Sequence, residues 1–221
     1  MYIINLMRIQ ILISKNSWAN KYKTHISRKL KKYTNNIKYF DNHKNLIKGY
    51  DINIIFSYFK IIPEKYLKFS KTNLIPHESK LPKGKGMSPL TWQILKKKDA
   101  IFFSLIEADI NIDNGVIYYQ KKVKLKKHLI FNEIKQIQLI ENLKLLERFI
   151  KYFKNYKKNP NGTIQKGESS YYKKRIPDDS RVNIDKTIRS QFNLLRVSDS
   201  KNYPAFFKMY GKKYIIKISK I

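Results

Sequence analysis

Short apolar runs rich in β-branched residues alternate with longer amphipathic segments in the first third of the chain. The runs Arg8–Ser14, Asn36–Phe40 and Asp51–Tyr58 have the composition of buried strands. Between them, residues 18–32 and 61–69 fit amphipathic helices. This β-α-β-α-β order predicts an α/β fold with a Rossmann-like, doubly wound sheet. In such a sheet, ligands bind beyond the carboxyl ends of the strands.

The middle of the chain continues the sheet. We expect strands at Asn73–Pro76 and Ala100–Glu107, with a helix opening at Ser88–Pro89 between them. Val116–Leu125 alternates enough to be an exposed strand or one arm of a hairpin. Residues 128–156 carry apolar side chains at three- and four-residue spacing, which predicts a long amphipathic helix with at most one break.

The clearest break in the chain is the polar stretch 157–169, which contains Asn-Pro and Asn-Gly turn signals. Beyond it, residues 185–197 fit a helix, and 205–210 and 213–218 fit two short strands joined at Gly211. This last part is too small to fold alone. We therefore expect a main domain at 1–156, a linker loop at 157–169 and a small C-terminal helix-plus-hairpin cap at 170–221.

The net charge of +31 would ordinarily suggest a nucleic-acid partner. Only seven of the 47 cations are arginines, and the lysines are dispersed along the chain, with no recognition motif among them. A basic nucleic-acid-binding protein is therefore the weaker alternative, although the positive field would help to recruit an anionic substrate.

The chain contains no cysteine, which excludes disulfides, thiolate nucleophiles and sulfur-ligated metals. No metal site is expected. The apolar opening MYIINLMRIQILIS is interrupted by Arg8, lacks the features of a signal peptide and is too short to span a bilayer. We interpret it as the first buried strand of a cytoplasmic protein that does not contact membranes.

His77 is the histidine with the most suggestive setting, because it follows an apolar strand and precedes a loop rich in glycine, lysine and proline. Asp113 lies in the turn after the next strand, and adjacent parallel strands would bring that turn beside His77, where a carboxylate can orient an imidazole. The plainer alternatives are a structural histidine and an aspartate that only forms a turn before Gly115. His25 and His43 are expected to be surface residues.

The loop containing Gly84 and Gly86 lacks the spacing of a P-loop or of a dinucleotide-binding motif. Its two glycines instead suggest positive φ angles or a close approach of the backbone to a ligand.

Three segments together resemble the formyltransferase family, which includes methionyl-tRNA formyltransferase and the sugar N-formyltransferases. They are HESKLPKGKGMSPLTWQIL, EADINIDNGVIYYQ and YYKKRIPDDSRVNIDKTIRSQFNLLRV. The first carries a His-x-Ser-x-Leu-Pro motif and the second an Asp-x-Gly turn. The third carries Arg175, Pro177, Asp179 and Arg196 at the positions of the family's Arg-x-Pro-x-Asp segment and the helix that follows it.

The resemblance implies a folate-dependent transferase that moves a formyl group from N10-formyltetrahydrofolate to a primary amine, with 1–156 as its catalytic domain. His77 would stabilise the developing oxyanion or take the proton of the amine, and Asp113 would hold His77 in place. The expected donor-binding residues are Ser79, Leu81, Pro82, Gly84 and Gly86. The expected acceptor-binding residues are Lys83, Arg175, Arg196, Tyr203 and Phe206.

Two positions depart from the family pattern. Ile75 occupies the place of the usual asparagine two residues before the histidine, and Asn73 is the nearest substitute as a third catalytic residue. Asn73 points to the same side of the strand as His77 but lies roughly 13 Å further along it. Val116 stands where many members have a second aspartate.

The resemblance leaves two acceptors open. The few residues after 169 favour a nucleotide-linked amino sugar, as in lipopolysaccharide biosynthesis, over the alternative of a methionyl-tRNA. The C-terminal hairpin and the strand after Gly115 would offer edges for a homodimer.

Overall fold

The computed structural model describes residues 7–221, so the first six residues of the expected opening strand lie outside it. At its centre is a six-stranded sheet in the order β2-β1-β3-β4-β6-β7. The first four strands, β1 (Arg8–Leu12), β2 (Asn36–Phe40), β3 (Tyr50–Ile55) and β4 (Ser70–His77), are parallel. The expected α/β class with a central, mostly parallel sheet is confirmed.

β6 (Ala100–Glu107) runs antiparallel to β4, which corrects the expectation of a parallel neighbour. The connection between them contains one short helix, α3 (Pro89–Leu95), and leads the chain into β6 at the carboxyl edge of β4, since His77 pairs with Ser104 and Leu74 with Glu107. β7 (Ile117–Lys124) then forms a hairpin with β6, one of the two expected arrangements.

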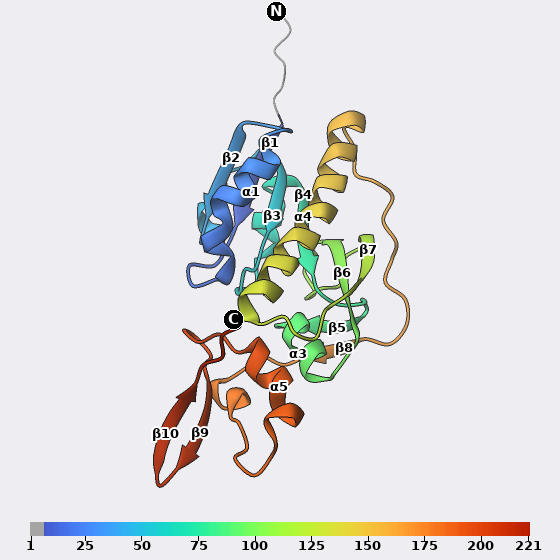
Figure 1. Ribbon diagram of the computed structural model, residues 1–221. Helices are drawn as coiled ribbons and strands as arrows, with labels where there is room; N and C mark the ends of the chain where they lie inside the picture. Colours follow the sequence, from blue (N-terminus) through green and yellow to red (C-terminus); the bar gives the residue numbers. More distant parts are fainter. Residues whose placement is uncertain (1–6) are drawn as a thin grey trace, which may run out of the picture.

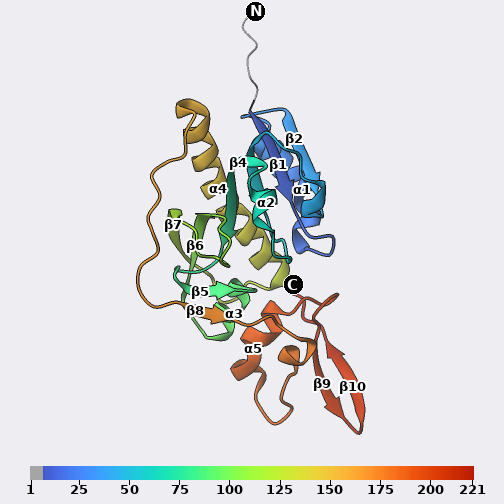
Figure 2. The same ribbon diagram turned by 180° about the vertical axis from the view of Figure 1, so that it is seen from behind.

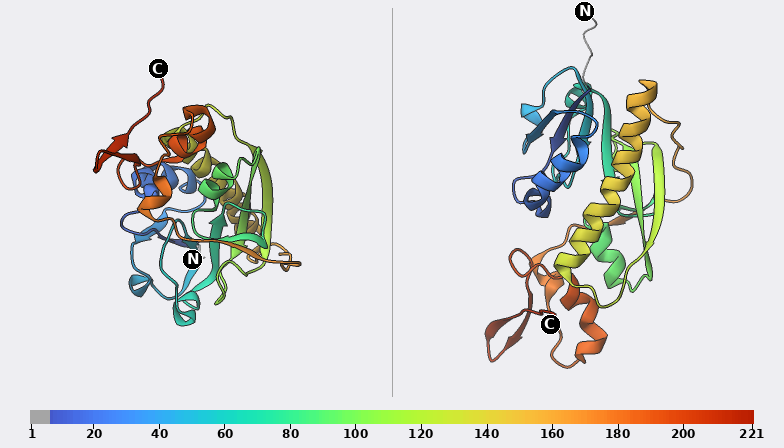
Figure 3. Two further views of the ribbon diagram at one scale, coloured as in Figure 1. Left: turned by 90° about the horizontal axis from the view of Figure 1, so that it is seen from below. Right: turned by 45° about the horizontal axis from the view of Figure 1, so that its top comes forward.

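Helices cover both faces of the sheet. The 3-10 turn η1 (Trp18–Tyr22), α1 (Lys23–Leu30) and α4 (Phe131–Tyr156) lie on one face, as Figure 1 and the right view of Figure 3 show. The short α2 (Glu64–Leu67) lies on the reverse face, and a turn, η2 (His43–Asn45), follows β2 (Figure 2).

α4 is one unbroken helix of 26 residues. Leu146, Phe149 and Ile150 on its inner face have no exposed surface. Burying side chains of this size contributes ~1.5–3 kcal/mol each, so α4 anchors this face of the core.

Residues 157–169, the crossing segment, run down the outer edge of β7 (Figure 2). Thr163 pairs with Ile117 there. The segment ends in β8 (Ser170–Tyr172), which pairs with β5 (Lys83–Gly86) in a separate two-stranded sheet. The expected boundary at residue 170 thus falls just before a strand that pairs with the main domain.

The cap lies below the sheet in Figure 1. It consists of η3 (Pro177–Ser180), α5 (Ile188–Val197) and the hairpin of β9 (Ala205–Met209) and β10 (Lys212–Ile216). α5 packs against α3 and α4. Across residues 7–221, none of the helices combines the length and apolar character needed to cross a bilayer.

Candidate active site

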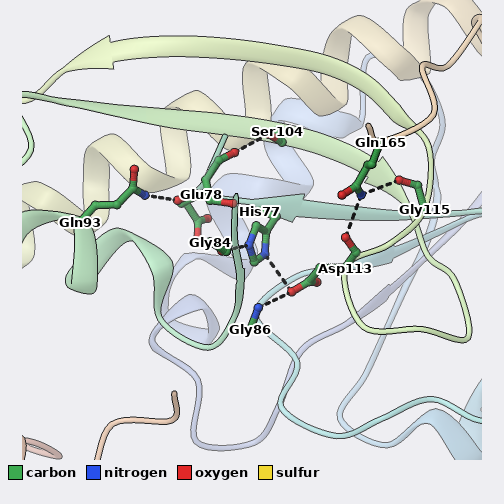
Figure 4. Close-up of polar contacts among 10 residues, drawn as sticks. His77, Glu78, Gly84, Gly86, Gln93, Ser104, Asp113, Gly115 and Gln165 are labelled. Carbon is green, nitrogen blue, oxygen red and sulfur yellow. Dashed lines mark hydrogen bonds and ion pairs between the residues drawn. The ribbon is translucent and has the colours of Figure 1, made fainter. Parts of the chain in front are cut away.

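His77 ends β4, and its side chain is buried. Its Nε2 lies 2.9 Å from the carbonyl oxygen of Gly84 on β5 (Figure 4). A carbonyl oxygen only accepts, so Nε2 carries the hydrogen and Nδ1 holds the lone pair of the neutral ring. Nδ1 faces Asp113, whose Oδ2 is 3.6 Å away. The fold therefore fixes both the tautomer and the direction of the basic nitrogen.

Asp113 reaches His77 by a route that differs from the expected one. β6 ends with Glu107 beside Leu74, three residues short of His77, and the loop 108–116 runs back to cover that distance. Asp113 has a left-handed φ of +51°. Its Oδ2 accepts a hydrogen bond of 2.8 Å from the backbone N–H of Gly86. The carboxylate is thus aimed at the imidazole, where it would stabilise the protonated ring.

Gln165 of the crossing segment holds this loop at two points (Figure 4). Its Nε2 donates to the carbonyl oxygens of Asp113 and Gly115, both at 2.8 Å. Gly115 lies so close to β6 that a Cβ would be 1.9 Å from the carbonyl oxygen of Glu107. The sequence offered no sign of this contact, because Gln165 lies in a polar stretch without periodicity.

Gly84 and Gly86 have positive φ angles of +81° and +91°, which was one of the two expected alternatives. Their close neighbour is Tyr172 of β8, since a Cβ on Gly86 would lie 2.5 Å from its carbonyl oxygen. The backbone groups of these glycines hold His77 and Asp113. β5, backed by β8, therefore positions both members of the pair.

The other expected donor-site residues lie between His77 and β5. Ser79 and Leu81 are buried, and Pro82 is half-buried. The Ser79 Oγ has no hydrogen-bond partner among the described residues. Lys83 is exposed, whereas Lys85 is buried and its Nζ donates to Asn114 Oδ1 at 2.7 Å. Lys85 is thus a buried cation beside the Asp113 loop.

The structure does not bring Asn73 to His77, which corrects the expectation of a third catalytic residue. Its Nδ2 donates to the carbonyl oxygen of Leu67 at 2.8 Å, and its Oδ1 accepts from Asn53 at 3.0 Å. Both ends of the amide are therefore engaged in the core. Ile75, on the same side of β4 as His77, contributes only an apolar side chain.

The two arginines expected at the acceptor are occupied inside the fold, which corrects that expectation. Arg196 is 4% exposed, and its Nη1 donates to the carbonyl oxygens of Lys126 and Lys127 at 3.1 Å. Arg175 is 8% exposed, and its Nη2 donates to Ser180 Oγ at 3.0 Å. Burial lowers the pKa of both guanidinium groups. Arg196 thus joins the cap to the main domain, and Arg175 holds a turn within the cap.

Phe206 is also buried in the cap, so it is not available to stack on a ligand. Tyr203 is half-buried, and its backbone N–H donates to the carbonyl oxygen of Asp199 at 2.9 Å. Of the expected acceptor residues, Lys83 and Tyr203 keep exposed surface.

A buried carboxylate network attaches the crossing segment to the sheet. Glu107 accepts hydrogen bonds from the backbone N–H of Asn73 at 2.6 Å and from Tyr118 Oη at 2.8 Å. Asn159 of the crossing segment donates to Tyr118 Oη at 3.0 Å. Burial raises the pKa of Glu107 and of Tyr118.

A shallow hollow of about 500 Å³ lies beside the Asp113 loop. Its apolar wall consists of Ile61, Ile110, Ile112 and Tyr171, all of which are exposed. Exposed apolar side chains gathered next to a buried polar pair are typical of a ligand site.

An imidazole of fixed orientation faces a carboxylate at the carboxyl edge of the sheet of a Rossmann-like fold, an arrangement that is typical of acid–base chemistry. Residues 10–148 match the Formyl transferase family, and the chain belongs to that family.

Two curated relatives share about 30% of their residues with the chain. The bifunctional polymyxin resistance protein ArnA of Wigglesworthia glossinidia brevipalpis is 30% identical over 86% of the chain and 29% of its own length. The GDP-perosamine N-formyltransferase of Brucella melitensis biotype 1 is 29% identical over 75% of the chain and 64% of its own length. The chain thus spans less than two thirds of either relative.

The fold also matches solved structures. The methionyl-tRNA formyltransferase from Clostridium thermocellum superposes with a TM-score of 0.80 at 21% identity, over 98% of this chain and 94% of that chain. At this level of identity the match supports the fold.

Proposed function

We propose that the protein transfers a formyl group from N10-formyltetrahydrofolate to the primary amine of a nucleotide-linked amino sugar. The observation that carries this proposal is the buried His77–Asp113 pair, in which Nε2 is committed to Gly84 and Nδ1 faces the carboxylate. The carbonyl oxygen and the carboxylate hold the imidazole in one orientation and favour its protonated form, so the ring can take up a proton, and membership of the formyl transferase family supplies the group that is transferred.

An amine that attacks a formyl carbon must lose a proton. His77 Nδ1 is the nitrogen that accepts it, because Nε2 already carries a hydrogen. The imidazolium that results lies beside the Asp113 carboxylate, whose orientation is fixed by the N–H of Gly86 and by Gln165. The gap of 3.6 Å between Nδ1 and Oδ2 then has to close by less than ~1 Å for Nδ1–H to donate to the carboxylate, and a general base placed in this way contributes ~10²–10⁴-fold to the rate.

The hollow beside Asp113 fits the folate donor. Ile112 and Tyr171 offer apolar surface for a flat ring system. The buried Ser79 Oγ, without a partner in the described chain, supplies a polar atom next to His77. When bound, the donor supplies the activated one-carbon group.

For the acceptor, the longer alignment with a sugar N-formyltransferase supports a sugar, and methionyl-tRNA formyltransferases are relatives as well. The Brucella relative, whose name specifies GDP-perosamine, aligns over 75% of the chain, against 65% for a methionyl-tRNA formyltransferase of Thermodesulfovibrio yellowstonii. We infer a 4-amino-4,6-dideoxyhexose on a nucleoside diphosphate, and hence a role in lipopolysaccharide biosynthesis. Methionyl-tRNA is the second candidate.

The test is a formyl-transfer assay with the folate donor against a panel of amino-sugar nucleotides and methionyl-tRNA. We expect turnover with at least one sugar nucleotide, and its loss in His77→Asn with an unchanged circular dichroism spectrum. Turnover with methionyl-tRNA and with none of the sugar nucleotides would refute the sugar acceptor and support methionyl-tRNA instead. Wild-type kcat in His77→Asn would refute the assignment of the base.

A further inference from the structure

A cavity of about 560 Å³ opens between the main domain and the cap. Its walls are residues 15–21 after β1, residues 130–132 at the start of α4, and residues 198–202 and 216–218 of the cap. None of these residues belongs to the His77–Asp113 pair or to the hollow beside it. Small-molecule sites typically measure ~300–1,000 Å³, so the cavity has the size of a ligand site.

The cavity lies at the same edge of the sheet as His77. The registers Leu12↔Ile55 and Ile54↔Leu74 put Ser14 level with His77, two strands away. Neighbouring strands are ~4.8 Å apart, so the lateral separation is ~10 Å. The cavity begins directly after Ser14, and this separation is comparable with the length of a hexose carrying a diphosphate.

The wall of the cavity is cationic. Four lysines line it, namely Lys15, Lys21, Lys201 and Lys217. Within the described chain the one acidic wall residue is Asp199, and both of its carboxylate oxygens accept hydrogen bonds inside its own turn, from Lys201 N and Asn202 Nδ2. The amino end of α4 opens onto the same space, and Glu133 of its first turn accepts from the Ile130 N–H and pairs with Lys220.

Trp18 and Phe131 form the aromatic part of the cavity wall. Both rings lie near a further lysine, Lys135, which is not itself part of the wall. The Nζ of Lys135 is 5.0 Å from the Trp18 ring centroid and 5.6 Å from that of Phe131. Burial lowers the pKa of Lys135 to about 8, against the opposing effects of Glu78 and Asp199. This amine is therefore partly neutral near pH 8, and an anion bound in the cavity would favour its protonated form.

We propose that this cavity binds the nucleoside diphosphate half of the acceptor, with Lys15 and Lys201 at the diphosphate and Trp18 at the base. The inference rests on the proposed function, since the sugar would extend from this cavity across the edge of the sheet to His77. Beyond the proposed function, the inference names the site that binds the nucleotide and the side chains that recognise it.

Tryptophan fluorescence tests the location, because the chain has two tryptophans and the other one, Trp92, stacks on Tyr172 away from the cavity. We expect GDP, UDP or dTDP to quench the emission of Trp92→Phe, in which Trp18 remains, and not that of Trp18→Phe. Quenching confined to the Trp18→Phe variant would overturn the proposal.

The cations are tested by pairs of substitutions that change the net charge equally. Lys15→Gln with Lys201→Gln should weaken binding of the nucleoside diphosphate at least ~10-fold, because two charge-assisted contacts to phosphate are lost. The matched control is Lys122→Gln with Lys124→Gln, two exposed lysines on β7. Equal weakening by both pairs would show a general field effect and would overturn the proposal.

Proton uptake supplies a readout that does not depend on catalysis. Calorimetry at about pH 8 in two buffers of different ionisation enthalpy should show uptake of up to ~0.5 proton per nucleotide, and the uptake should disappear in Lys135→Met.

The two proposals fail separately. Formyl transfer to a sugar nucleotide without quenching of Trp18 fluorescence would refute nucleotide binding in this cavity. The proposed function would then still stand. Nucleotide binding at Trp18 without any formyl transfer would support the cavity and refute the proposed function.

Discussion

Replacing Lys135 by methionine should make the stability of the protein less dependent on pH in the alkaline range. Burial lowers the pKa of this lysine from the ordinary value of 10.5 to about 8 in the folded state. Below about pH 8 the side chain is charged in both states, and folding carries the full cost of burying it. Between the two pKa values, the unfolded chain binds a proton that the folded chain does not, so wild-type stability rises with pH.

The size of the effect follows from the same two values. The difference between 10.5 and about 8 corresponds to about 3 kcal/mol at ~1.4 kcal/mol for each pH unit. Methionine keeps the length and apolar stem of lysine and carries no charge at any pH, so it stands in for the neutral side chain. We therefore expect Lys135→Met to be the more stable protein by ~3 kcal/mol near pH 7.

The assay is urea unfolding of both proteins at several values between about pH 7 and about pH 10.5. The free energy of unfolding of the variant relative to wild type should fall by about 3 kcal/mol across this window, while the titration of the other lysines cancels in the difference. A difference that stays constant with pH would refute the reasoning, because Lys135 would then titrate alike in both states.

Three further changes test how the site and the cap are held. Gly115→Ala should destabilise the protein by at least ~3 kcal/mol in thermal or urea unfolding, because its Cβ would collide with the carbonyl oxygen of Glu107; full stability would contradict this. Gln165→Ala should lower kcat for formyl transfer ~10- to 100-fold at nearly constant KM, since the Asp113 loop loses both of its hydrogen bonds from this side chain; a change in KM alone would argue against a positioning role. Arg196→Met should cost ~3 kcal/mol and expose the cap to limited proteolysis, and an unchanged cleavage pattern would count against it.

The pattern of apolar residues predicted the bounds of a strand or helix well where that pattern was nearly continuous. The strand Ala100–Glu107 has the predicted bounds, because an apolar run broken only by Ser104 follows the polar residues before it. The long helix has no break, since no proline or glycine occurs between Phe131 and Tyr156. The predicted helix at 61–69 shortens to Glu64–Leu67, and the one at 185–197 begins at Ile188.

The features that the sequence did not predict depend on contacts between distant segments. The direction of β6 depends on the edge of the sheet at which the connection after β4 leads the chain into β6, which periodicity does not encode. Gln165 meets Asp113 from 52 positions away, and Arg196 meets Lys126 from 70 positions away, so neither role leaves a local signal. A basic side chain looks the same in sequence whether it binds a ligand or caps a buried turn.

The pairing of β5 with β8 has a consequence for the order in which the protein is made. All six strands of the central sheet have left the ribosome once Lys124 has emerged, but the partner of β5 is not synthesised until Ser170–Tyr172. Until then, Gly84 and Gly86 lack Tyr172, the residue of β8 that packs against their backbone. The sheet and its covering helix α4 are thus synthesised before the partner of β5, and the His77–Asp113 pair is among the last features of the main domain to be completed.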